Sequence, residues 1–190
     1  AKTFGYYSIA SLVAIHIHNF LLAFGSFIFP RVSYNLANHH DLKSIYFISR
    51  SLIAIPGWII LSVLILGGDF IFKTWLGEET FVNSIFYIKL YLVFESAMLL
   101  IIVPFHFING TEHIRLNSLF EGMIRSFHFI SIVIGYYFYG TTGILYGLLI
   151  STLINIPFQY FYFHKKVIQI PNTGNFLLII VPVFWLFGIL

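Results

Sequence analysis

The feature that most constrains the fold of this chain is a series of apolar stretches, each about 20 residues long or longer. An α-helix of that length crosses the hydrocarbon core of a bilayer, which is about 30 Å thick. Strands of a membrane barrel would instead alternate apolar and polar residues over about 9–11 positions. The sequence therefore predicts an all-α, polytopic bundle of membrane helices. Five complete spans are expected at residues 4–29, 48–71, 84–108, 116–138 and 142–163, with a truncated sixth from 175.

The composition supports a lipid-facing surface. Hydrophobic residues make up 59% of the 190 residues and charged residues only 9%, whereas soluble domains average about 45–50% and 25%. This excludes a disordered chain and a soluble enzyme. The ten Lys and Arg residues are too sparse for a nucleic-acid interface. Because cysteine is absent, disulfides and thiolate metal sites are excluded as well.

The apolar stretches begin close to Ala1 and continue to Leu190. We therefore expect residues 1–190 to form a single transmembrane bundle that is a piece of a longer protein.

The basic residues in the connections between the apolar stretches, or at the edge of a stretch, are unevenly distributed between the two sides of the predicted bundle. One side carries six of them: Arg31, Lys43, Arg50, Arg115, Lys165 and Lys166. The other side carries Lys2 and Lys73. Since Lys and Arg are enriched in cytoplasmic loops, the side with six is expected to be cytoplasmic.

Three ionisable residues interrupt the span 116–138. Glu121, Arg125 and His128 are spaced at i, i+4 and i+7, which places them on one helix face, with the Glu and Arg close enough to pair. A charge in the middle of a membrane costs about 2.5–3.5 kcal/mol, so such residues are candidates for function. Two interpretations remain open: an ion pair that fixes helix packing, and a group of side chains that faces a substrate.

The span 84–108 contains Lys89 and Glu95. Lys89 is near the outer end, where its long side chain can reach the interface. Glu95 is deeper, and His106 follows it eleven residues later, about 20° away around the helix. Glu95 is expected to face other helices or an aqueous cavity, where it could titrate. The alternative is a hydrogen bond that only joins two helices.

The sequence predicts no enzymatic chemistry and no cofactor. Motifs for nucleophilic hydrolysis, zinc proteases, phosphate loops and dinucleotide binding are all missing. His16 and His18 fall on different helix faces, so a metal site with two His residues at helical spacing is not predicted.

Several short runs occur in a recognisable order along the chain: GYYSIA at 5–10, FPRVS at 29–33, RS at 50–51, TWLG at 74–77 and YGTTGI at 139–144. In order and spacing they resemble the polysaccharide flippases, or O-antigen-type transporters, of the multidrug/oligosaccharidyl-lipid/polysaccharide exporter superfamily. The resemblance covers most of the chain and fits the carboxy-terminal half of that family.

The resemblance implies a multi-pass protein of the bacterial inner membrane. Its substrate would be an undecaprenyl-diphosphate-linked oligosaccharide, moved to the periplasmic face by alternating access. By similarity of role, Arg125 and Lys89 become candidates for contact with the anionic substrate. Glu121 and Glu95 become candidates for orienting these cations or for coupling a proton or sodium ion, and His128 is a further candidate for substrate binding. The chain would then be part of one lobe of a longer transporter. Besides this substrate, the expected partners are membrane lipids.

Two other functions fit the same sequence. A cation-coupled multidrug exporter of the same superfamily would need a buried acid, which Glu95 provides. A membrane-embedded glycosyl or acyl transferase belongs to a different functional class, and a group-transfer assay would identify it.

Overall fold

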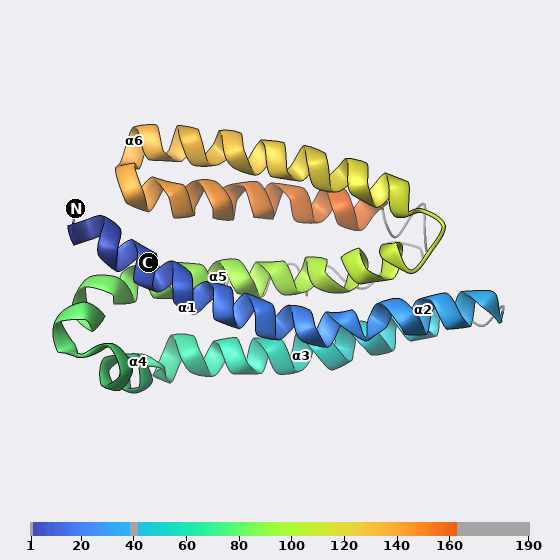
Figure 1. Ribbon diagram of the computed structural model, residues 1–190, viewed down its shortest axis with the longest axis horizontal. Helices are drawn as coiled ribbons and strands as arrows, with labels where there is room; N and C mark the ends of the chain where they lie inside the picture. Colours follow the sequence, from blue (N-terminus) through green and yellow to red (C-terminus); the bar gives the residue numbers. More distant parts are fainter. Residues whose placement is uncertain (1, 39–41, 163–190) are drawn as a thin grey trace.

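The computed structural model describes residues 2–38 and 42–162, and in these residues the regular structure is entirely helical (Figure 1). The helices are α1 (Lys2–Ser26), α2 (Ile28–Ala37), α3 (Leu42–Gly67), α4 (Asp69–Leu76), α5 (Glu78–Asn109) and α6 (Ile114–Tyr162). The prediction of an all-α bundle is confirmed. The predicted sixth span, Lys165 and Lys166 lie outside the described residues.

Four stretches are long and apolar enough to cross a membrane: Lys2–Ala37, Leu42–Gly67, Glu78–Asn109 and Ile114–Pro157. The predicted spans 4–29 and 84–108 lie within the first and third of them. The predicted span 48–71 extends too far, because α3 ends at Gly67 and the chain turns at Gly68 into the short helix α4.

The helix α6 is folded back on itself at Gly140 (Figure 1). Gly140 has φ 60° and ψ −141°, a backbone conformation that essentially only glycine adopts. The break divides 49 helical residues into two antiparallel arms, each longer than the about 20 residues that a crossing needs. We call residues 114–139 the first arm and residues 141–162 the second arm. They correspond to the predicted spans 116–138 and 142–163.

Glycines bring the two arms into backbone contact. A Cβ atom on Gly135 would overlap the carbonyl oxygen of Gly143, and a Cβ on Gly143 would overlap that of Gly135. Gly147 faces the backbone of Ser131 in the same way. The hairpin therefore depends on residues without side chains, as is common where membrane helices pack closely.

The connections sort into two ends of the bundle (Figure 1). At one end lie the end of α2, the start of α3 and the turn between α5 and α6; α4 and the Gly140 turn lie at the other. Four of the basic residues expected on the cytoplasmic side belong to the first end, which we call the basic end: Arg31, Lys43, Arg50 and Arg115. Lys2 and Lys73 belong to the opposite end, which we call the far end.

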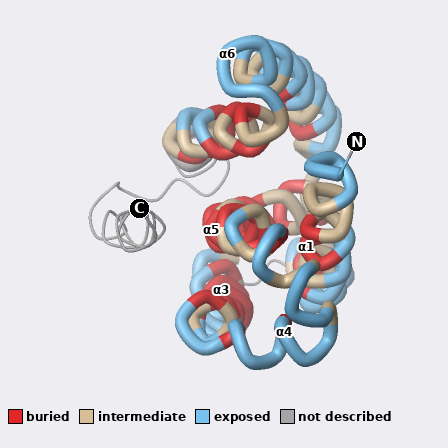
Figure 2. The backbone as a smooth tube through the Cα atoms, turned by 90° about the vertical axis from the view of Figure 1, so that its left-hand side faces the viewer, coloured by how far each residue is buried: buried red, intermediate tan, exposed pale blue. Residues whose placement is uncertain are grey.

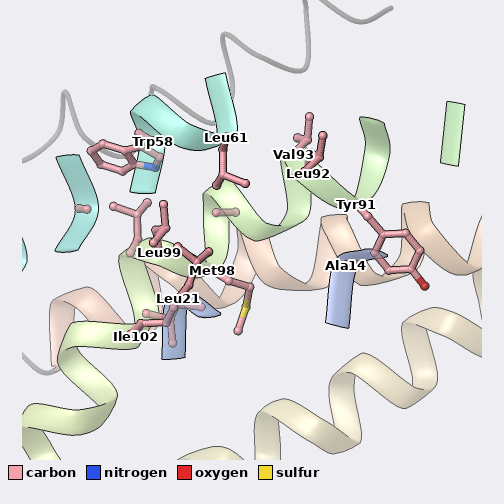
Figure 3. Packing of buried hydrophobic residues seen from close by; sticks show 14 of the residues in the cluster. Ala14, Leu21, Trp58, Leu61, Tyr91, Leu92, Val93, Met98, Leu99 and Ile102 are labelled. Atoms are coloured by element: carbon pink, nitrogen blue, oxygen red, sulfur yellow. The ribbon is translucent and has the colours of Figure 1, made fainter. Parts of the chain in front are cut away.

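The helix α5 is the centre of the bundle, and most of its residues are buried (Figure 2). Figure 3 shows Trp58 and Leu61 of α3 packed with Leu99 and neighbouring residues of α5. The indole nitrogen of Trp58 also donates a hydrogen bond of 3.0 Å to the carbonyl oxygen of Ser96. Large apolar side chains also cover the outside of the bundle, as expected where lipid is the solvent.

Candidate functional site

Polar and ionisable side chains follow the line where α1, α5 and the first arm of α6 approach one another. We call this group the polar seam. It consists of His18 on α1, of Glu95, His106 and Asn109 on α5, and of Asn117, Glu121 and Arg125 on α6.

The pair His18–Glu95 joins α1 to α5. Nδ1 of His18 lies 2.8 Å from Oε2 of Glu95. Glu95 is only 2% exposed, whereas the side chain of His18 is 29% exposed. Glu95 thus faces another helix, as one reading of the sequence expected, and it bonds there to a group that can hold a proton.

Glu121 and Arg125 form the predicted ion pair, with Nη2 of Arg125 3.3 Å from Oε2 of Glu121. The Arg125 side chain is 67% exposed. The guanidinium is close enough to His18 on α1 and to His128 on its own helix for its charge to act on both imidazoles. The pair therefore belongs to the seam and leaves the guanidinium accessible.

His128 was predicted to share a face with this pair; the charge of Arg125 reaches its imidazole, but within the described residues no hydrogen bond joins His128 to the pair. It is buried between the two arms of α6, where its Nε2 lies 3.3 Å from the hydroxyl of Thr152. Its hydrogen bond lies within the helix hairpin.

Lys89 lies in the first half of α5, toward the far end of the bundle. Its ammonium group is 3.0 Å from a carboxylate oxygen of Asp69 on α4. Six residues separate it from Glu95, which puts the two about 120° apart around the helix. The structure therefore does not bring Lys89 together with Glu95 and Arg125.

The basic end of the seam opens into a hollow of about 580 Å³. Polar residues from α5 and α6 line it together with apolar ones: Phe29, Phe105, His106, Asn109, Ile114, Asn117, Ser118 and Glu121. The amide of Asn117 donates a hydrogen bond of 2.7 Å to the side-chain oxygen of Asn109. Nε2 of His106 is buried and has no hydrogen-bond partner within residues 2–38 and 42–162.

Sequence reasoning did not assign a role to His18, Asn109 or Asn117. Asn109 falls in the connection between the predicted spans 84–108 and 116–138, and Asn117 is the second residue of the latter, so both read as residues at the membrane surface. The partnership of His18 with Glu95 depends on how α1 and α5 are aligned, which no local pattern reports. A polar residue within an apolar span was the available signal for His18.

Chemically, the seam offers an accessible guanidinium, amide groups that donate and accept hydrogen bonds, and a His–carboxylate pair that can share a proton. In the part of the chain that the structure describes, no three His, Asp or Glu side chains are close enough together to hold a metal ion.

We found no family model, curated protein or solved structure that matches this chain.

Proposed function

We propose that the chain is part of a transporter that moves an undecaprenyl-diphosphate-linked oligosaccharide across the bacterial inner membrane by alternating access. One observation carries this proposal: an accessible arginine, Arg125, lies in a polar seam whose basic end opens into a hollow. No covalent step is needed for such transport.

The basic end suits a substrate that carries phosphate. The exposed cations Arg31, Lys43 and Arg115 would attract an anionic head group at the cytoplasmic surface, where each cation near the membrane contributes about 1 kcal/mol. The hollow next to them presents Asn109, Asn117 and Ser118, whose side chains donate and accept hydrogen bonds as sugar hydroxyls do.

Arg125 would receive the diphosphate deeper in the seam. A guanidinium binds phosphate through two parallel hydrogen bonds, and charge-assisted bonds of this kind are stronger than neutral ones. Glu121 holds the side chain of Arg125 in place until phosphate replaces it as partner. This exchange of partners would keep the cation paired throughout the transport cycle.

We expect Arg125→Ala in the full-length protein to reduce the export of surface polysaccharide at least tenfold, because a charge-assisted hydrogen bond contributes about 1.5–3 kcal/mol. Two further variants, Glu95→Gln and Lys89→Ala, are measured beside Arg125→Ala. Of these, Lys89→Ala should reduce export less than threefold, since its partner is Asp69 at the far end. The measurement is surface polysaccharide at matched protein levels.

Lys73→Ala is the control, because it removes an exposed cation that pairs with Glu78 outside the seam. Normal polymer with Arg125→Ala, or an equal loss with Lys73→Ala, would contradict the proposed role. Group transfer by the purified protein would instead support a transferase.

The buried pair His18–Glu95 favours a second candidate, a cation-coupled multidrug exporter of the same superfamily. A carboxylate that is 2% exposed and bonded to an imidazole can take up and release a proton during transport. Drug efflux from vesicles that depends on an imposed proton or sodium gradient, with no oligosaccharide transport, would favour this candidate.

A further inference from the structure

A narrow apolar groove runs along the outer surface between α1–α2 and α3. It consists of two hollows of about 160 Å³ and 90 Å³ that share Phe24, Leu52 and Ile53 as lining residues. The first hollow also reaches Arg31 and Ser49 near the basic end. The second reaches Phe20 and Ile60 deeper along the same helices. We call the two together the α1–α3 groove.

The spacing of the residues explains why a groove forms here. Phe20, Phe24 and Phe27 follow one another at intervals of three or four along α1 and its junction with α2, so they form one wall. Leu52, Pro56 and Ile60 form the facing wall in the same way.

The inner side of the groove is closed at Gly57, where the missing side chain lets α3 pack closely onto α5. A Cβ on Gly57 would lie 2.8 Å from the side chain of Leu99, so α3 packs closely onto α5 at this point. The walls remain open to the outside, with Phe24 49% and Leu52 64% exposed.

The dimensions of the groove match one hydrocarbon chain of one membrane leaflet. Phe20 and Arg31 are eleven residues apart, which is about 16 Å along a helix. Half of a hydrocarbon core is about 15 Å. A helix of another protein segment, about 10 Å across, is too wide for hollows of these volumes.

A cation lies where the head group of such a lipid would be. Arg31 is exposed and lines the basic end of the groove together with Ser49. Within the described ranges, 2–38 and 42–162, no carboxylate pairs with its guanidinium. Arginine binds phosphate with two parallel hydrogen bonds, so the charge complements an anionic phospholipid.

From these observations we infer that the α1–α3 groove is a binding site for an anionic phospholipid of the surrounding bilayer. One acyl chain lies between the two apolar walls, and the phosphate contacts Arg31. The site is separate from the polar seam, and the inference does not depend on what the chain transports.

Quenching of tryptophan fluorescence by brominated lipids tests the inference. The full chain carrying Phe24→Trp is reconstituted in mixed phosphatidylcholine and phosphatidylglycerol vesicles, with bromine on the acyl chains of one lipid at a time. The signal of the three native tryptophans is subtracted with the unaltered protein. We expect phosphatidylglycerol to bind next to the added indole about fivefold more strongly than phosphatidylcholine, the size that one arginine near an anionic lipid provides.

Three variants make the test specific. Arg31→Gln on the Phe24→Trp background should abolish the preference, whereas Lys43→Gln, which removes a cation of the same end outside the groove, should keep it. Ile59→Trp alone places the indole on an exposed part of α3 that does not line the groove, and it should report no preference.

Equal quenching by both lipids in Phe24→Trp would overturn the inference, and so would a preference that survives Arg31→Gln. An indole that neither lipid quenches would show that protein covers the groove, which contradicts the inference as well.

Discussion

Replacing His18 by leucine is expected to lower the free energy of unfolding by about 3 kcal/mol, because it leaves the buried carboxylate of Glu95 without its partner. Replacing Glu95 by leucine should cost less, about 1 kcal/mol. The imidazole that then remains is 29% exposed and can find other partners. The smaller loss follows from the unequal burial of the two side chains.

The double variant distinguishes this account from two independent losses. His18→Leu together with Glu95→Leu removes both polar groups, so it should cost about 1 kcal/mol and give a coupling of about 3 kcal/mol. The measurement is unfolding by denaturant in detergent micelles. His16→Leu is the matched control. His16 is exposed and lies two positions before His18 on the same helix, so its replacement should leave stability unchanged. Additive losses, or a larger loss for Glu95→Leu than for His18→Leu, would show that the pair does not join α1 and α5.

Replacing Gly143 by valine is expected to cost about 3 kcal/mol or more and to open the α6 hairpin. The new Cβ would overlap the backbone of Gly135, and backbone atoms cannot move aside as a flexible side chain can. The thermal unfolding temperature, followed by helical circular dichroism, should fall by several degrees.

Gly122→Val is the control for this variant. Gly122 lies on the first arm of the same helix, and nothing is within 4 Å of the position that its Cβ would take. We expect this change to be neutral or slightly stabilising, because glycine is a poor residue inside a helix. Equal effects of the two substitutions would contradict the close packing of the arms.

Much of the helical layout follows from the sequence, because length and apolar character decide it locally. The break at Gly140 was predictable from two adjoining apolar stretches with a short Gly-containing turn between them. The ion pair of Glu121 with Arg125 was also predictable, since residues four apart on a helix are neighbours.

The partners of residues far apart in the sequence were not predictable. His18 and Glu95 are 77 positions apart, so their bond requires the alignment of α1 with α5. His128 bonds to Thr152 because the second arm returns beside the first, although its spacing suggested the face of Glu121 and Arg125. The end of α3 was misplaced for a related reason: α4 is nearly as apolar as a span, and only the turn at Gly68 separates them.

We expect the helices to cross a membrane five times within residues 2–162, with the basic end on the cytoplasmic side. Because the chain contains no cysteine, single cysteines report sidedness without a further change. Asn38→Cys and Glu112→Cys mark the basic end, and Glu78→Cys and Tyr139→Cys mark the far end.

An impermeant maleimide is applied to cells with an intact inner membrane, before and after lysis. We predict that Glu78→Cys and Tyr139→Cys react before lysis, whereas Asn38→Cys and Glu112→Cys react only afterwards. Reaction of Tyr139→Cys on the same side as Glu112→Cys would contradict the account.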